Sequence, residues 1–265
     1  MISKTQRQQL FGLAIDAATL DEALARCEGA IRTRSRMLVG VVNAAKIVNL
    51  RKDAKLRDSV LECDMILADG QSVVWASKIL SRPLPERVAG IDLFEGLLDL
   101  ADQKHYSLYL LGATPGVVTA LAETIRHRFP NAVIAGWRDG YFTDDEAESV
   151  AQRITIARPD MLFLGIVSPK KEIFLGRFGA GLGVPVLHGV GGSFDVMAGV
   201  TRRAPESWQR VGLEWAYRLK QEPGRLWRRY LRTNAAFIVQ VIIERFRPTP
   251  AWEPQDLRTT NQARK

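Results

Sequence analysis

Polar residues follow several short apolar runs of this chain, where an α/β protein presents side chains to a ligand. Asp69 follows the run Met65–Ala68 and precedes Gly70. A carboxylate at this position can accept a proton from a hydroxyl group as that oxygen attacks, if the two lie within hydrogen-bond reach. The alternative is an Asx turn that closes the strand. Asn43 ends the preceding run, where it either orients a substrate hydroxyl or caps the following helix.

Two glycine-rich turns offer backbone amides to an anion. The turn that begins at Gly112 joins a strand to a helix, and its amides can face a diphosphate at the helix N-terminus. It lacks the G-x-G-x-x-G spacing and so indicates a dinucleotide site only weakly. The turn that begins at Gly191 ends in Asp195, whose carboxylate can accept hydrogen bonds from a ribose or a base edge. Both also fit simple tight turns.

Metal ligation has little support in the sequence. The three histidines have no paired spacing, and no Asp-x-Asp sequence occurs. We therefore expect neither a metal nor a cofactor, so arginines would have to neutralise a diphosphate leaving group. The candidates are Arg218, Arg225, Arg228 and Arg229. Tryptophans and tyrosines are interleaved with them, which favours a docked surface over a solvated helix face.

These residues need a frame that brings them together. Continuously apolar runs predict strands buried on both faces at Met37–Val42, Asp64–Ala68, Ser107–Leu111, Ala132–Gly136, Asp160–Ile166 and Pro185–Val190. Helical spacing predicts helices over Gly90–Lys104, Val117–Phe129 and Asp144–Arg158. The alternation predicts an α/β, Rossmann-like body, a parallel sheet with helices on both faces. Ligands of such sheets bind outside the carboxyl ends of the strands, where the candidate residues lie.

Composition divides the chain into a neutral body and a basic end. The 265 residues are 46% hydrophobic and 25% charged, which excludes wholesale disorder, collagen and a polytopic membrane protein. Residues 1–200 hold 23 basic and 23 acidic residues, and residues 201–265 hold 14 and 6, so the net charge of +8 lies in the last quarter. We expect a catalytic body over 1–200, a basic helical appendage over 201–247 and a disordered tail over 248–265.

The basic end predicts an anionic contact through phosphates, a lipid surface or nucleic acid. An apolar stripe from Phe237 to Ile242 lies beside the arginines and predicts contact with a membrane surface or, alternatively, with another subunit. The first 20 residues lack an export signal, and no run approaches the roughly 18 apolar residues of a spanning helix. We therefore expect a cytoplasmic protein that is peripheral on the membrane. Cys27 and Cys63 are predicted to be small buried hydrophobes.

Over about residues 8–247 the chain resembles the WecG/TagA/CpsF family of bacterial glycosyltransferases. Three spaced blocks carry the resemblance. They are Ala68-Asp69-Gly70 with Glu86 to Asp92, then Asp139-Gly140-Tyr141-Phe142 with Ser168 to Glu172, and lastly Gly191 to Asp195 through Arg203-Ala204-Pro205 to Gly212–Leu219 and Glu222-Pro223.

The resemblance implies a UDP-sugar-dependent hexosyltransferase. It would invert the anomeric centre, use no metal, and act on a polyprenyl-diphosphate-linked sugar at the inner face of the cytoplasmic membrane, in surface or exopolysaccharide synthesis. Asp69 is implied to be the base, with Asn43 and Arg87 in the pocket and Tyr141 and Asp195 on the uridine side. The appendage is implied to complete the site, with Arg218, Arg225 and Arg228 on the diphosphate.

Two positions depart from the family pattern. Val41 stands where many members have Thr, and Lys171 replaces the Gln of the usual Pro-Lys-Gln-Glu. Both are expected near the donor sugar, so the donor cannot be carried over from members that use N-acetylmannosamine. A hexose and a uronic acid both stay open, and a substrate-binding Lys171 favours a carboxylate.

Two other functions compete with this interpretation. A non-catalytic anion- or nucleotide-binding protein with a basic C-terminal arm predicts steep salt dependence and no preference for UDP. The balanced body and the lack of a nucleic-acid motif count against nucleic acid as a partner. A nucleotide-sugar oxidoreductase predicts NAD binding, and the missing G-x-G-x-x-G counts against it.

Overall fold

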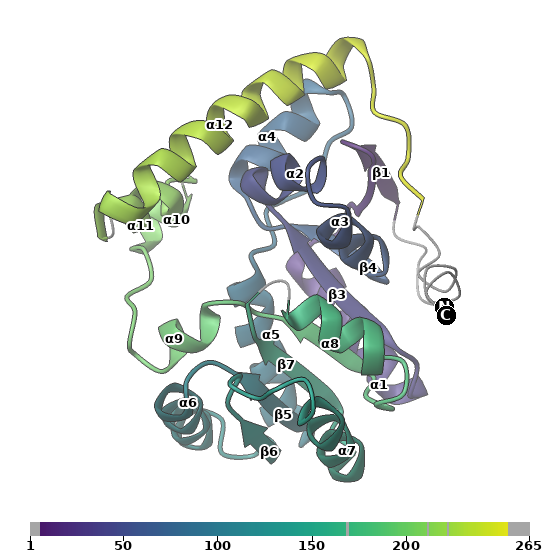
Figure 1. Cartoon of the computed structure of the whole chain (residues 1–265), viewed down its shortest axis with the longest axis vertical. Coiled ribbons are helices and arrows are strands. Elements are labelled where there is room, and N and C mark those ends of the chain that lie inside the picture. Colours follow the sequence, from purple (N-terminus) through teal and green to yellow (C-terminus); the bar gives the residue numbers. More distant parts are fainter. Residues whose placement is uncertain (1–5, 168–169, 211, 222, 254–265) are drawn as a thin grey trace.

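A six-stranded parallel sheet forms the centre of the protein (Figure 1). The computed structural model describes residues 6–167, 170–210, 212–221 and 223–253. The strand order is β4-β3-β8-β7-β5-β6, and every neighbouring pair is parallel. The strands are β3 (Met37–Val42), β4 (Met65–Ala68), β5 (Ser107–Gly112), β6 (Val133–Arg138), β7 (Met161–Gly165) and β8 (Val186–Gly189). The α/β, Rossmann-like prediction is confirmed.

Helices cover both faces of this sheet. In chain order the helices of the described residues, those of the appendage included, are α1 (Leu20–Thr33), α2 (Ala44–Leu50), α3 (Ala54–Leu61), α4 (Gln71–Ile79), α5 (Gly90–Lys104), α6 (Pro115–Arg128), α7 (Ala147–Ala157), α8 (Lys170–Phe178), α9 (Ser193–Met197), α10 (Glu206–Arg210), α11 (Glu214–Gln221) and α12 (Pro223–Phe246). One face packs on α1, α5, α6 and α9, and part of the other on α7 and α8. Successive strand residues alternate between the two cores because side chains alternate along a strand.

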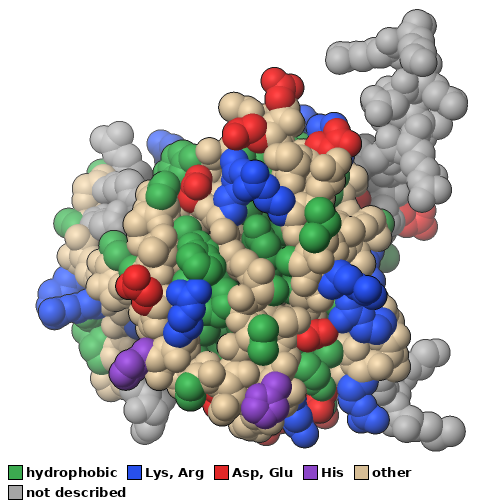
Figure 2. All heavy atoms as spheres, turned by 90° about the horizontal axis from the view of Figure 1, so that it is seen from below, with side chains coloured by type: hydrophobic (Ala, Val, Ile, Leu, Met, Phe, Trp, Pro, Cys, Tyr) green, Lys and Arg blue, Asp and Glu red, His purple; other side chains and the backbone are tan. Residues whose placement is uncertain are grey.

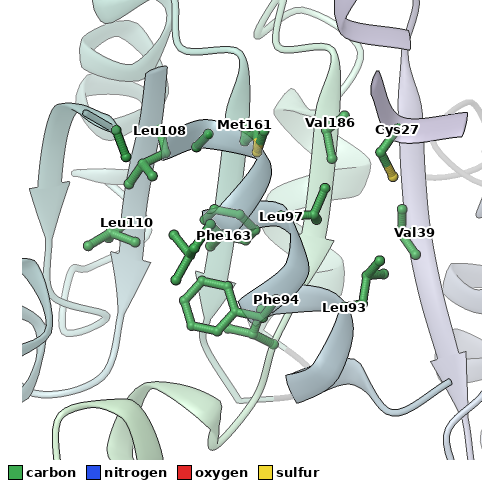
Figure 3. Packing of buried hydrophobic residues seen from close by; sticks show 14 of the residues in the cluster. Cys27, Val39, Leu93, Phe94, Leu97, Leu108, Leu110, Met161, Phe163 and Val186 are labelled. Carbon is green, nitrogen blue, oxygen red and sulfur yellow. The ribbon is translucent and has the colours of Figure 1, made fainter. Parts of the chain in front are cut away.

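Aromatic and aliphatic side chains fill the core beneath α5 (Figure 3). The ring of Phe94 meets that of Phe163 edge to face, with their centroids 4.6 Å apart. Leu97 and Val186 continue the same fully buried layer. This core fixes the start of α5, and hence Gly90, against the carboxyl ends of the strands.

An N-terminal β-hairpin, which the sequence patterns did not predict, joins the sheet's β4 side. It consists of β1 (Arg7–Leu10) and β2 (Leu13–Asp16), paired antiparallel. The buried carboxylate of Asp16 accepts a hydrogen bond from the Ile66 amide at 2.9 Å and pairs with Arg26 at 2.7 Å. The hairpin thereby becomes part of a third core, shared with α2, α4 and α12.

The long helix α12 runs across α2 and α4 (Figure 1). Its Phe237 is buried against Phe11, with ring centroids 5.4 Å apart. The buried Glu244 accepts hydrogen bonds from the Phe11 amide at 3.1 Å and the Thr249 amide at 3.0 Å. Over the described part of the chain, no helix is both long and apolar enough to cross a bilayer.

Residues 248–253, expected to belong to a disordered tail, are instead packed on the body. The Trp252 amide donates to the Gly12 carbonyl at 2.9 Å, and Arg57 lies over the Trp252 ring at 5.6 Å. The composition of this segment suggested disorder. The residues that hold it in place, Gly12 and Arg57, lie far away in the sequence, so no local pattern could indicate its packing. Residues 254–265 lie outside the described part.

The surface farthest from α12 carries both basic and acidic side chains (Figure 2). Figure 2 shows this end of the molecule, where basic and acidic side chains are interspersed.

Buried Cys27 and half-buried Cys63 are free thiols, and burial raises the pKa of Cys27 to about 12 and that of Cys63 to about 11.

Candidate active site

A cavity of about 840 Å³ lies at the carboxyl ends of β3, β4 and β8, beneath α12. Five of the residues predicted from the sequence line it: Asn43, Asp69, Arg87, Lys171 and Gly191. Gly191 has φ +54°, a conformation that favours glycine, in the turn after β8. Parallel strands present their carboxyl ends at one edge of a sheet, which explains why residues so far apart in sequence meet here.

Asp69 projects into this cavity from the end of β4. Its Oδ1 accepts a hydrogen bond from the Gly90 amide at 3.1 Å. Its Oδ2 lies 3.5 Å from Asn43 Nδ2, at the long limit of a hydrogen bond. One carboxylate oxygen is thus firmly held, and the other faces the cavity with a weak partner.

Asn43 serves as the N-cap of α2. Its Oδ1 accepts the Lys46 amide at 3.0 Å, so the capping interpretation is confirmed. The cap fixes the side chain so that Nδ2 points to Asp69. Capping and positioning of the site are therefore performed by one residue.

Arg87 links the body to the appendage. Its guanidinium lies 2.6 Å from Glu214 on α11 and 3.3 Å from Asp92 on α5. Arg203, which also lines the cavity, pairs with Asp92 as well and reaches Glu95 at 3.5 Å. This charged network holds the start of α11 over the cavity.

The two adjacent lysines at the start of α8, Lys170 and Lys171, make different contacts. Lys170 donates to the carbonyls of Gly140 at 2.8 Å and of Phe142, and so holds the loop after β6. Lys171 lines the cavity, with its Nζ 3.1 Å from Glu172. Val41 lines the same cavity, so both positions that depart from the family pattern face the ligand space.

Lys46 is a cavity residue that the sequence analysis missed. Its Nζ donates to the Val41 carbonyl at 2.9 Å. Burial, reinforced by the charge of Lys171, lowers the pKa of Lys46. Its place three residues after Asn43 was the available signal, but its burial depends on α8 and could not be seen in the sequence.

His188 supports the site from within the sheet. The side chain is fully buried on β8, and its Nε2 lies 3.1 Å from the Gly90 carbonyl. The backbone N–H of the same residue, Gly90, donates to Asp69. Burial lowers the pKa of His188, so the ring is neutral and its Nε2–H donates to the carbonyl.

Three other predicted residues do not line this cavity. Gly112 has φ +143°, and a Cβ there would lie 2.3 Å from the carbonyl carbon of Gly165, so strand packing alone requires glycine. Tyr141 is 75% exposed on the loop after β6, and Asp195 lies on α9. Their roles in binding a nucleotide stay predictions.

The three diphosphate arginines implied by the resemblance lie on the appendage helices, but their side chains, like that of Arg229, fall outside the described part of the structure. Arg218 belongs to α11, and Arg225 and Arg228 belong to α12. The described arginines that line the cavity are Arg87, Arg202, Arg203 and Arg245. Ser168 and Pro169, in the second family block, also lie outside the described residues. Within the described residues, no three His, Cys, Asp or Glu side chains gather as metal ligands would.

The sheet and the carboxylate-bearing cavity at its edge define a Rossmann-like α/β protein with a ligand site beneath an added helix. The chain matches the profile of the glycosyl transferase WecG/TagA/CpsF family over residues 8–251, and it belongs to this family.

Two relatives carry the same name, N-acetylglucosaminyldiphosphoundecaprenol N-acetyl-beta-D-mannosaminyltransferase. The one from Bacillus spizizenii is 43% identical over 168 residues, which cover 63% of this chain and 64% of that protein. The one from Bacillus subtilis is 37% identical over 194 residues, which cover 73% of this chain and 75% of that protein. The match therefore spans slightly less than two thirds of the Bacillus spizizenii protein.

Proposed function

We propose that this chain transfers a sugar from a UDP-sugar to a sugar carried on a polyprenyl diphosphate, with inversion at the anomeric carbon. The observation that carries the proposal is Asp69, with its Oδ2 open to a cavity of about 840 Å³ at the carboxyl edge of the sheet. Membership of a glycosyltransferase family supports it. So do the names of the relatives, which specify a diphosphoundecaprenol-linked acceptor.

In the proposed reaction Asp69 acts as the general base. The acceptor hydroxyl gives its proton to Oδ2 as its oxygen attacks the anomeric carbon. The bond from that carbon to the UDP oxygen breaks on the opposite face, and UDP leaves with the bonding electrons. Asn43 and the Gly90 amide hold the carboxylate in place, which keeps the base aimed during the reaction.

Arginines of the appendage are proposed to stabilise the charge on the departing diphosphate. Arg218, Arg225 and Arg228 lie on helices that cover the cavity, and the Arg87–Glu214 pair holds the first of these helices in place. Preorganised guanidinium groups can replace a metal ion in this role. We accordingly propose a reaction that needs no metal.

The donor is proposed to be distinguished at Lys171. Lys171 and the partly buried Lys46 place two amines on one side of the cavity, with Glu172 as a neighbouring carboxylate. A donor that bears a carboxylate, such as a UDP-uronic acid, would find a cation there. We place the enzyme on the cytoplasmic membrane surface, in polysaccharide synthesis, because its proposed acceptor is a lipid.

The proposal is tested with a panel of UDP-sugars and a short-lipid diphosphate acceptor that carries N-acetylglucosamine. The panel includes N-acetylmannosamine, its uronic acid, glucose and glucuronic acid as donors. We expect one donor to be transferred, with an inverted anomeric configuration by NMR and an unchanged rate in the presence of a chelator. UDP binding without any transfer would favour a nucleotide-binding protein instead. A retained configuration would refute the direct displacement, and strong inhibition by chelator would refute metal independence.

A further inference from the structure

Exposed apolar side chains gather at the mouth of the cavity that holds Asp69. Two of them, Trp75 and Ile79, are 50% and 60% exposed on α4. Three others, Ile238, Ile242 and Phe246, are 60%, 56% and 80% exposed on α12. Large apolar side chains that line one concave surface and stay in contact with water mark a binding site for an apolar ligand.

The spacing of these residues gives the mouth the form of a groove. The two residues of α4 are four apart, and those of α12 follow at intervals of four, so each set lies on one face of its helix. The stripe on α12 covers eight residue steps, or about 12 Å. Figure 1 shows α12 passing beside α4. The helices therefore supply two apolar walls that lead away from the polar floor.

The apolar stripe predicted over Phe237 to Ile242 is thereby divided between two environments. Phe237 is buried in the core against Phe11 and is not available to any partner. Ile238 and Ile242 line the cavity mouth. Their position inside the concavity fits a ligand that enters the site, whereas a flat membrane surface would meet the convex side.

The floor and the mouth of the cavity differ in chemistry and are continuous. The floor carries Asn43, Asp69 and Arg87, and Arg245 lies among the apolar residues at the rim. A ligand that satisfies both parts has a polar, anionic head and a hydrocarbon tail. A prenyl diphosphate that bears a sugar has this constitution, and a second copy of the chain seated on the mouth would close the route to Asp69.

We infer that the groove between α4 and α12 binds the first isoprene units of the acceptor's lipid chain, while the sugar and diphosphate lie on the floor. This inference rests on the proposed function. It makes Trp75, Ile79, Ile238 and Ile242 specificity residues that select a lipid-linked acceptor over a water-soluble one. Burial of apolar surface provides the selection, and each isoprene unit that buries about 55 Å² in the groove is expected to raise affinity about tenfold.

The test compares acceptors with one to four isoprene units on the same sugar diphosphate. In the unaltered protein, kcat/KM should rise with each of the first units and then level off. The double variant Ile79→Gln and Ile242→Gln should lower the ratio of kcat/KM for the longest and shortest acceptors about tenfold. Ile156→Gln is the matched control, because Ile156 is 80% exposed on α7, away from the cavity. An unchanged ratio in the double variant would overturn the inference.

Two further measurements separate the other occupants. Loss of vesicle binding without a change in the chain-length ratio would assign the stripe to the membrane surface, and a change in oligomeric state by sedimentation would assign it to a second copy. Either result would overturn the inference that the groove binds the isoprene units of the acceptor. Prenyl diphosphates without a sugar should quench tryptophan fluorescence in a chain-length-dependent manner, and this quenching should weaken in the double variant. This readout holds even if no sugar is transferred, so failure of the proposed function is distinguishable from failure of the groove.

Discussion

Replacement of Asp69 by Asn tests the centre of the proposed chemistry with little change in shape. Oδ1 of the carboxylate accepts the Gly90 amide at 3.1 Å, and the amide oxygen of the variant can keep this bond. The new NH₂ group would then face Asn43 Nδ2, now 3.5 Å from Oδ2, so two donors would meet. Because that contact is already long, the cost in folding free energy should be about 1 kcal/mol.

The cost to catalysis should be far larger. A positioned general base contributes roughly 100- to 10,000-fold to the rate, which corresponds to about 3–5 kcal/mol of the activation barrier. The amide cannot accept the proton of the acceptor hydroxyl, so Asp69→Asn should lose this whole factor. Binding of UDP should change little, because the carboxylate acts on the acceptor hydroxyl and not on the nucleotide.

The assay follows UDP release at saturating donor and acceptor, with UDP affinity measured by calorimetry on the same preparation. Asp99→Asn is the matched control, since Asp99 is an exposed carboxylate on α5 that does not line the cavity. We expect normal turnover in the control. Turnover within about threefold of the unaltered protein in Asp69→Asn would refute the base assignment.

Three further predictions concern the fold that supports the site. Glu244→Ala removes the acceptor of the Phe11 and Thr249 amides and should cost about 2–4 kcal/mol of unfolding free energy in urea, whereas the exposed control Glu253→Ala should cost almost nothing. Burial holds the pKa of Cys27 and Cys63 far above neutrality, so at about pH 8 iodoacetamide should modify neither thiol, by mass spectrometry, until urea is added. Burial also lowers the pKa of His188, so between about pH 7.5 and 5.5 the unfolded chain binds a proton that the folded chain does not. Stability should therefore fall on acidification, and the fall should be smaller in His188→Asn.

The body of the fold could be predicted from the sequence because parallel strands buried on both faces are continuous apolar runs. The predicted strand Met37–Val42 coincides with β3, and the other five agree with the structure to within two residues at each end. The hairpin β1–β2 gave no such signal, since Arg7-Gln8-Gln9-Leu10 is largely polar. Its order depends on contacts with β4 and α12, which a local pattern cannot contain.

In the site, too, residues with a local sequence signal could be predicted, whereas contacts between distant segments could not. Asp69 and Asn43 could be located because both directly follow apolar strands, and the sheet topology brings strand ends together. The pair of Arg87 and Glu214 joins residues 127 positions apart, so its partner could not be read from either segment. Partly buried Lys46 shares a small cavity with residues of α8, and Trp75 and Ile79 resemble ordinary surface residues until α12 is placed beside them.

The hydrogen bond from the Phe11 amide to Glu244 spans 233 positions of the chain. During synthesis the hairpin leaves the ribosome early. Its apolar side chains stay uncovered by α12 until nearly the whole protein has been made. The same helix roofs the cavity, so a nascent chain holds Asp69 and Asn43 long before it has a closed site. Final assembly of the ligand site and protection of the first strand are thus one late event. A chain that stops before α12 therefore has neither a closed cavity nor a covered hairpin.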